Sequence, residues 1–490
     1  MSGFRLLSFL IAAIWLVCFW EWSIGFFPIS DTTRAVLTQI PEFVILIGVL
    51  AAQGKLGSSS KGFRGIGHGL DPLLLLFLSW IVISTLLTSG SSARHLAPDL
   101  LVSLLNIKAL VRYIAVFYLI VKIDWSVTNY MRIRSAILMV VVVQVAIGLA
   151  QLYFGKAVLE FFSPRGIEEA FGLAREAFVD RERRSLEIYG TFRNTISYAY
   201  LMMIGVIVIL VAGIRFGPIG SRALALLPIA MIFASGSRIV LFLTLAIYTL
   251  YLFNLNFARA SKAKVLFFST TGTLLSVATY TFILSLDLKI ERDTAAFVFS
   301  KDYIEAAMNQ RLGIISLVLP QLISDPQIFL GFGADKYYIA NYAISTTYLA
   351  NYALIASLKL TLEDVYWVSL LLYFGIPGFL LFCVFLYKIY ARLSYVVRTQ
   401  DRWISEVAEI ARLLLLLSIP LNFVNQAFEV QIFALIFWSF SAIALRSSQR
   451  PMSGDIERSQ KLDVGNGAVA LADPPVSFAM KKLGLGKVAR

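Results

Sequence analysis

Long runs of apolar residues recur along this chain, and short polar stretches separate them. A helix needs roughly 20 apolar residues to cross the hydrocarbon core of a bilayer. The pattern therefore predicts an all-α polytopic membrane protein with about 12 transmembrane helices. The predicted spans are about residues 4–22, 34–52, 71–89, 100–121, 135–155, 194–214, 222–237, 239–257, 265–286, 364–387, 406–424 and 427–445.

The seventh and eighth runs are nearly continuous, and only Gly236-Ser237-Arg238 interrupts them. We interpret this interruption as a sharp hairpin on the outer face of the membrane. The alternative is one long tilted helix, which would move every later element to the opposite side. The hairpin is favoured because the alternation of basic and non-basic loops continues unchanged on both sides of Arg238.

Basic residues gather in every second loop, and this sets the expected orientation. If the N-terminus is cytoplasmic, the inner loops hold most of the lysines and arginines, whereas the short outer loops carry few charges. Under the positive-inside rule, both termini are then cytoplasmic. The predicted inner loops are residues 53–70, 122–134, 215–222, 258–264 and 388–402.

The composition excludes a soluble fold, because 58% of the residues are hydrophobic and only 15% are charged. A net charge of +13 could indicate nucleic acid, but the cations are spread over short loops, so we expect a bilayer and no nucleic acid as partner. The first run continues into Glu21-Trp22 without a cleavage site, which indicates a retained anchor. Cys18 and Cys383 lie in apolar runs, which favours buried thiols over a disulfide.

These patterns divide the chain into a transmembrane domain, residues 1–445, and a polar tail, residues 446–490, that we expect to be disordered and cytoplasmic. Two outer segments, about 155–191 and 286–362, are long enough to be structured. The first reads as an amphipathic helix at the interface. Its arginines either act on a ligand or pair within a solvated face.

The second outer segment contains a predicted helix that carries Arg311. Apolar residues recur at helical spacing after it, and Asp325-Pro326 ends the helix. Leu330-Gly331-Phe332-Gly333 then turns the chain. We therefore expect a large helical loop between transmembrane helices 9 and 10. Its tyrosines either stack on sugar rings or form an interfacial aromatic belt.

Four motifs, in this order, resemble those of bacterial O-antigen ligases and of O-antigen or exopolysaccharide polymerases. The resemblance covers roughly residues 190–380. The motifs are Gly190-Thr191-Phe192-Arg193-Asn194, Gly236-Ser237-Arg238, Arg311 with Asp325-Pro326 and Gly331-Phe332-Gly333, and Glu363-Asp364 before Gly375-Ile376-Pro377-Gly378.

The resemblance implies a glycosyltransferase at the periplasmic face of the bacterial inner membrane, with both long outer segments as periplasmic loops. Such enzymes move a glycan from an undecaprenyl pyrophosphate carrier to an acceptor hydroxyl on a second glycan. The resemblance also implies an inverting, metal-independent reaction, no cofactor, and chain-length regulators and flippases as partners. The sequence offers no metal site, since Asp-x-Asp and ligand-spaced His, Cys or carboxylate clusters are absent from the outer loops.

The leaving pyrophosphate needs cations, and a guanidinium group binds phosphate oxygens in a bidentate manner. We expect Arg238 and Arg311 to bind the pyrophosphate, with Arg193 as a third candidate. An arginine kept on the side disfavoured by the positive-inside rule needs a reason of this kind. The alternatives are that Arg238 snorkels to the interface and that Arg311 pairs with Glu305 or Asp302.

The acceptor hydroxyl needs a base or an orienting group. Ligases of this family carry a histidine about eleven residues before the first glycine of Gly-x-x-Gly, where this chain has Asp364 with Glu363 beside it. The two histidines, His68 and His95, lie elsewhere. This departure favours a polymerase over a ligase that acts on lipid A core. A carboxylate can serve as general base or only orient the hydroxyl, or the pair caps the next helix.

A transporter, such as a flippase for lipid-linked oligosaccharides, is the alternative from another class. Twelve spans with both termini inside suit a carrier. However, the two halves show no internal repeat, and ionisable residues within the predicted spans are few, with Glu42 and Glu429 as the main ones. We therefore place the transporter second.

Overall fold

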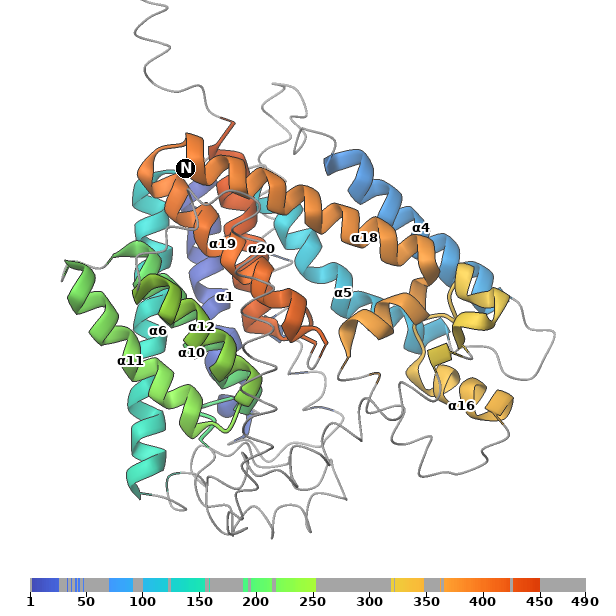
Figure 1. Ribbon diagram of the computed structural model, residues 1–490, viewed down its shortest axis with the longest axis horizontal. Helices are drawn as coiled ribbons and strands as arrows, with labels where there is room; N and C mark the ends of the chain where they lie inside the picture. Colours follow the sequence, from blue (N-terminus) through green and yellow to red (C-terminus); the bar gives the residue numbers. More distant parts are fainter. Residues whose placement is uncertain are drawn as a thin grey trace, which may run out of the picture. The chain divides into compact units, whose positions relative to one another are not determined.

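The computed structural model describes ten stretches of the chain and a few isolated residues between them. Every regular element in these stretches is a helix, as the sequence predicts (Figure 1). The helices lie within residues 1–448, which form one compact unit; residues 449–490 form a second unit. The described stretches are 2–25, 70–90, 100–121, 125–154, 188–192, 195–213, 217–252, 319–347 without 321, 365–423 and 426–449.

Ten of the predicted spans coincide with helices; residues 265–286 lie outside the described residues, and only isolated residues of 34–52 are described. Within the described part, α4, α6, α10 and α18 are long and apolar enough to cross a membrane. The helices are α1 (Ser2–Gly25), α4 (Leu70–Gly90), α5 (Leu100–Ile120), α6 (Val127–Phe154), α10 (Thr195–Ala212), α11 (Gly217–Ala234), α12 (Arg238–Leu252), η4 (Pro326–Phe329), α16 (Lys336–Thr347), α18 (Tyr366–Thr399), α19 (Arg402–Leu421) and α20 (Gln431–Ser447).

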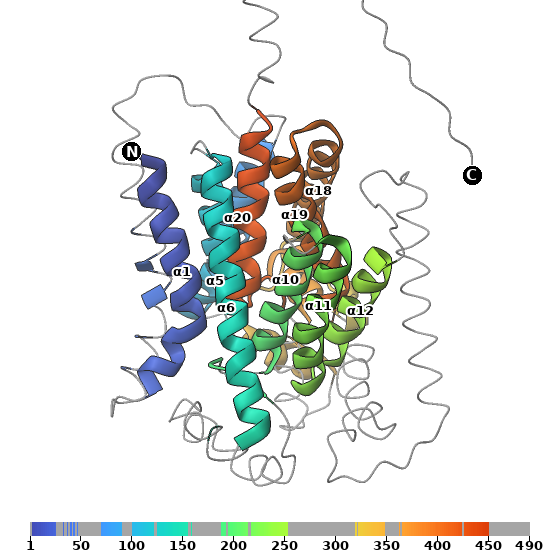
Figure 2. The same cartoon turned by 90° about the vertical axis from the view of Figure 1, so that its left-hand side faces the viewer.

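Helix α10 is the centre of the bundle. It packs against α6, α11, α12, α19 and α20, and nearly all of its side chains are buried. Figure 2 shows α1, α6 and α20 upright, in agreement with the contacts of α1 with both α6 and α20, and α5 packs against α20. Large apolar side chains such as Leu75 and Val142 remain exposed on the outer helices, as expected where a helix faces lipid.

The predicted hairpin at Gly236 is confirmed, because α11 and α12 are separate helices joined by residues 235–237. Gly236 has a φ of 70°, a left-handed conformation that glycine adopts without steric cost. The Tyr248 hydroxyl of α12 donates to the Arg222 carbonyl of α11 at 3.3 Å, so the two helices are antiparallel. A single long tilted helix is therefore wrong.

Helix α18 corrects the sequence prediction in two ways. It continues to Thr399, so most of the predicted inner loop 388–402 is helical. It is also broken at Gly375, which has φ 69° and ψ −176°. Pro377 follows this break, and its ring would clash with the carbonyl four residues earlier in an unbroken helix. The helix therefore consists of a short first segment before Gly375 and a long second segment after it.

The bundle of described helices has two ends, and polar contacts identify each of them. At one, the C-terminus of α6, residues 188–192 and the turn between α11 and α12 lie together, because the Ile188 N–H donates to the Ala234 carbonyl at 3.3 Å. We call this the loop end; it is the lower end in Figure 1. At the other, the N-terminal turns of α6 and α19 meet through Tyr130 and Glu406. We call this the basic end, because Arg134 and Arg402 lie there.

Candidate functional site

Arg238 is the one predicted site residue that lies within the described part of the chain. It is the first residue of α12 and is half-buried at the loop end. Ser237 precedes it, and the Ser237 carbonyl accepts from the Leu241 N–H at 3.0 Å, so the helix starts directly at the turn. Arg193, Arg311, Glu363 and Asp364 lie outside the described residues.

The start of the Gly190-Thr191-Phe192 motif is held by two buried glutamines of α6. Gln151 accepts from the N–H groups of Tyr189 and Gly190, at 3.2 and 2.9 Å, and donates to the Gly190 carbonyl at 2.8 Å. Gln144 accepts from the Thr191 N–H at 3.1 Å. The motif therefore lies against α6 beside the turn that carries Arg238.

Gly190 is required at this position. Its φ is 59°, and a Cβ atom there would lie 2.2 Å from Oε1 of Gln144. The Thr191 hydroxyl also donates to the Cys18 carbonyl of α1. These contacts fix the chain just before Arg193, so two of the motifs singled out in the sequence share one place at the loop end.

The Gly331-Phe332-Gly333 loop crosses α18 at its break. The Phe332 N–H donates to the Leu372 carbonyl at 2.7 Å, and the Gly333 N–H donates to the Tyr373 carbonyl at 3.3 Å. The indole N–H of Trp80 in α4 donates to the Phe374 carbonyl at 2.7 Å. Three carbonyls next to the break, those of Leu372, Tyr373 and Phe374, thus accept from donors outside α18, as buried backbone groups require.

Two glycines allow this crossing. A Cβ atom on Gly331 would lie 2.4 Å from the Tyr373 carbonyl oxygen, and one on Gly375 would lie 2.5 Å from the Phe329 carbonyl oxygen. The loop is held further by Ser84 of α4, which donates to the Leu330 carbonyl, and by Asn106 of α5, which donates to the Ala334 carbonyl, both at 2.6 Å. Two motifs more than 40 residues apart therefore form one unit.

Aspartates cap the short helices on either side of this loop. Asp325 accepts from the Gln327 N–H at 2.8 Å and from the Tyr342 hydroxyl, so Asp325-Pro326 ends one helix and starts η4, as predicted. Asp335 accepts from the first N–H groups of α16. The Tyr342 ring packs on Phe332, with ring centroids 5.2 Å apart, which gives this tyrosine a role in holding the loop.

Tyr338 of α16 lies near the same aspartate. Burial raises the pKa of the Tyr338 hydroxyl, and two smaller effects act on it: the hydrogen bond with Gln327 lowers the pKa and the Asp325 charge raises it. The phenol is therefore neutral at physiological pH and is a hydrogen-bonding group, not a base.

Five polar residues, which the sequence analysis did not select as site residues, surround the start of α18. The Leu362 carbonyl accepts from Gln426 at 2.8 Å, and the Trp367 N–H donates to the Asn422 carbonyl at 3.5 Å. The Glu429 carbonyl accepts from Arg112 of α5 at 3.3 Å. We call these residues the α18 entry cluster: Arg112, Tyr366, Asn422, Gln426 and Glu429.

The α18 entry cluster adjoins the chain positions of Glu363 and Asp364, since Leu362 and Tyr366 flank that pair. Arg112 lies inside a predicted span, and charge within an apolar run is a signal that could have identified it. Asn422 and Gln426 carry no such signal, because amides are common in the connections between helices.

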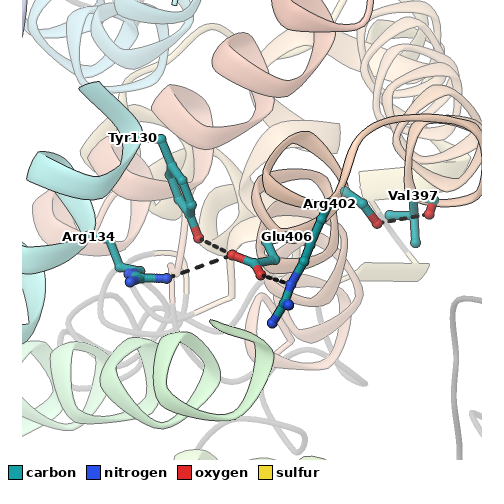
Figure 3. Close-up of polar contacts among 6 residues, drawn as sticks. Tyr130, Arg134, Val397, Arg402 and Glu406 are labelled. Atoms are coloured by element: carbon teal, nitrogen blue, oxygen red, sulfur yellow. Dashed lines mark hydrogen bonds and ion pairs between the residues drawn. The ribbon is translucent and has the colours of Figure 1, made fainter. Parts of the chain in front are cut away.

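The basic end holds a second group of charges. Glu406 of α19 lies 3.7 Å from Arg134 of α6 and 3.1 Å from Arg402, and it accepts from the Tyr130 hydroxyl at 3.4 Å (Figure 3). One turn further along α19, Glu409 and Arg412 form a 2.7 Å ion pair and are 9% and 1% exposed.

The expectation that Glu42 and Glu429 are the main ionisable residues within the predicted spans is incomplete. Arg112 in α5 and the Glu409–Arg412 pair in α19 belong with them, and Glu42 lies outside the described residues. Averaging over an apolar run hides such residues, although the Glu409–Arg412 spacing of three positions is that of a helical ion pair. In the described part of the chain, no three His, Cys, Asp or Glu residues are grouped to hold a metal ion.

No protein-family model matches this chain, and a search of the curated proteins finds no significant match.

Proposed function

We propose that the protein polymerises undecaprenyl-pyrophosphate-linked oligosaccharide repeat units into O-antigen or exopolysaccharide. The reaction takes place at the periplasmic face of the bacterial inner membrane, where the loop end lies, and both termini are cytoplasmic. The observation that carries this proposal is the binding of the Gly331-Phe332-Gly333 loop to the break in α18.

Non-helical backbone at membrane depth is tolerated where it is buried in protein or lines an aqueous cavity, and it is characteristic of functional sites. In this protein the break leaves α18 with a short first segment, which starts at Tyr366, two residues after Asp364. The loop that supports the break follows Arg311 in the chain, and Arg238 starts α12 at the loop end. The motifs that contain or border the proposed site residues in the sequence thus include described glycines with positive φ, namely Gly190, Gly236, Gly331 and Gly375.

In the proposed reaction, the acceptor hydroxyl oxygen attacks the anomeric carbon of the donor glycan and the bond to pyrophosphate breaks. The electron pair of that bond leaves on the pyrophosphate, and Asp364 or Glu363 orients the hydroxyl and takes its proton. Arg238, Arg311 and Arg193 stabilise the charge that grows on the leaving group. Direct displacement inverts the anomeric centre.

A ligase that transfers the glycan to lipid A core is the closest alternative, and Asp364 at the position of the ligase histidine disfavours it. A transporter is the second candidate, and the buried Glu409–Arg412 pair is the observation that favours it, because ionisable groups inside spanning helices are typical of ion-coupled carriers.

A deletion strain complemented with Arg238→Lys, Arg311→Lys or Asp364→Asn tests the proposal. We expect single repeat units to accumulate on the carrier, with long-chain polymer reduced roughly 100-fold to 1,000-fold, as for loss of one transition-state contact. Arg402→Lys at the basic end is the matched control and keeps full polymer. Lipid-linked glycans and surface polymer are profiled by gel electrophoresis and mass spectrometry.

The other outcomes separate the alternatives. Long chains that remain on the carrier indicate a ligase. Full-length polymer from all three variants contradicts the arginine and carboxylate roles. If Glu409→Gln alone abolishes the polymer and repeat units stay on the cytoplasmic leaflet, the transporter is correct.

A further inference from the structure

Two members of the α18 entry cluster bury polar groups that have no partner among the described residues. Asn422 is 0% exposed, and neither its Oδ1 nor its Nδ2 makes a hydrogen bond within that part of the chain. The Tyr366 hydroxyl is likewise buried and without a hydrogen-bond partner there. A buried polar group without a partner destabilises the fold, so a ligand that supplies the missing partner would gain binding energy there.

The fold makes no use of these two side-chain groups. Asn422 ends α19 through its backbone alone: its N–H donates to the Ser418 carbonyl at 2.9 Å, and its carbonyl accepts from the Trp367 N–H. The Tyr366 ring packs on Phe428 and Phe382, with centroids 5.5 and 6.1 Å away, and these contacts do not need the hydroxyl. Leucine and phenylalanine would serve the packing equally well.

Charged and aromatic groups lie around the same two residues. Glu429 lies just before α20, and Arg112 donates to its backbone carbonyl at 3.3 Å. Half-buried Trp367 packs beside Tyr366 and against Phe423, whose ring is exposed next to Asn422. An amide, a phenol and aromatic faces together suit a sugar ring, whose hydroxyls both donate and accept hydrogen bonds.

We propose that Asn422 and Tyr366 hydrogen-bond the terminal sugar ring of the acceptor glycan, with Trp367 and Phe423 as the apolar faces of the subsite. This inference rests on the proposed function and assigns acceptor recognition to the α18 entry cluster, separately from the arginines that bind the donor pyrophosphate. The cluster is also next to the proposed base in the chain, because Glu363-Asp364 directly precede Val365 and Tyr366.

The test uses Asn422→Leu and Tyr366→Phe in the purified full-length protein. The probe is the repeat-unit glycan released by mild acid from the carrier lipid of the deletion strain, and its Kd is measured by calorimetry. We expect each variant to weaken binding at least about tenfold, because the site then lacks a hydrogen bond to the sugar. The melting temperature stays the same or rises, since each substitution removes a buried polar group that lacks a partner.

Ser441→Ala is the matched control, because its hydroxyl on α20 is also buried without a partner among the described residues. This control leaves both the Kd and the melting temperature close to the wild-type values. Unchanged Kd in Asn422→Leu and Tyr366→Phe overturns the inference, and so does the absence of glycan binding by the wild type.

A polymerisation assay with carrier-linked repeat units separates this inference from the proposed function. If the wild type forms no polymer, the proposed function fails. If the wild type forms polymer and Asn422→Leu does so with an unchanged KM for the acceptor, the acceptor subsite alone is wrong. A raised acceptor KM with an unchanged donor KM supports it.

Discussion

At the scale of single residues, the structure depends on positions where no side chain fits. Gly331 and Gly375 bring the backbone of a loop against the backbone of a broken helix, and any Cβ atom there would push the two apart. The sequence marks both glycines as parts of motifs, but it does not show that they face each other, since that contact exists only once α18 is broken.

We expect Gly331→Ala to destabilise the protein by about 1–3 kcal/mol and to reduce polymer formation. The φ of Gly331 is 88°, and the alanine Cβ atom would lie 2.4 Å from the Tyr373 carbonyl oxygen. The melting temperature of the purified protein and the polymer profile measure the effect. Gly213→Ala is the control: its φ is 51°, but a Cβ atom meets nothing within 4 Å. If both variants lose the same stability, the positive φ alone explains the effect, and the close contact between the Gly331 loop and α18 contributes nothing.

At the scale of elements, the apolar runs predict the existence of the helices well and their ends poorly. The sequence predicts an end for α18 at residue 387, which is too early, because Lys388, Arg392 and Arg398 are typical of an inner loop. In the structure these residues share a helix with the buried Ile389, Leu393 and Val396, which continue the helical period. A charged face on one side of a helix thus resembles a loop when only average polarity is considered.

At the basic end, Glu406 of α19 forms ion pairs with two arginines, and we expect the two pairs to differ in strength. Arg402 is 86% exposed and shares the helix of Glu406, whereas Arg134 is 17% exposed and reaches Glu406 from α6. We expect Arg402→Ala to change the stability by less than about 0.5 kcal/mol, as for an exposed pair on one helix.

By contrast, Arg134→Ala removes a largely buried partner that links two helices, and we expect a loss of roughly 1–3 kcal/mol. Thermal unfolding at low and high salt compares the two variants. A larger effect of Arg402→Ala, or a loss in Arg134→Ala that vanishes in salt, would contradict this ranking, because salt screens exposed charges more than buried ones.

At the scale of the whole molecule, the sequence predicts the fold class, and the structure shows which motifs lie against which helices. An all-helical protein with helices able to cross a membrane follows from the apolar runs alone. The grouping of Gly190 with α6 depends on Gln144 and Gln151, and that of residues 330–334 with α4 and α5 depends on Ser84 and Asn106. Single side chains of this kind leave no periodic signal, so sequence patterns do not reveal them.

The proposed orientation, with the loop end periplasmic and the basic end cytoplasmic, predicts which end a membrane-impermeant reagent reaches from outside the cell. In a variant with both native cysteines replaced by alanine, Tyr337→Cys lies on α16, after the loop that crosses α18, and Arg402→Cys lies at the basic end. Both side-chain positions are exposed. We expect a membrane-impermeant maleimide to label Tyr337→Cys in spheroplasts and Arg402→Cys only after permeabilisation. The reverse pattern would place the proposed site in the cytoplasm.

The attachment of residues 330–334 to α4, α5 and α18 has a consequence for how such chains can diverge. Both borders of the stretch between α16 and α18 are fixed, by the loop before it and by the start of α18 after it. Doubling the length of a chain between two fixed points costs only about 0.6 kcal/mol of closure entropy. Insertions and deletions in this stretch therefore cost little closure entropy, so related chains can vary its length while the anchoring glycines stay in place.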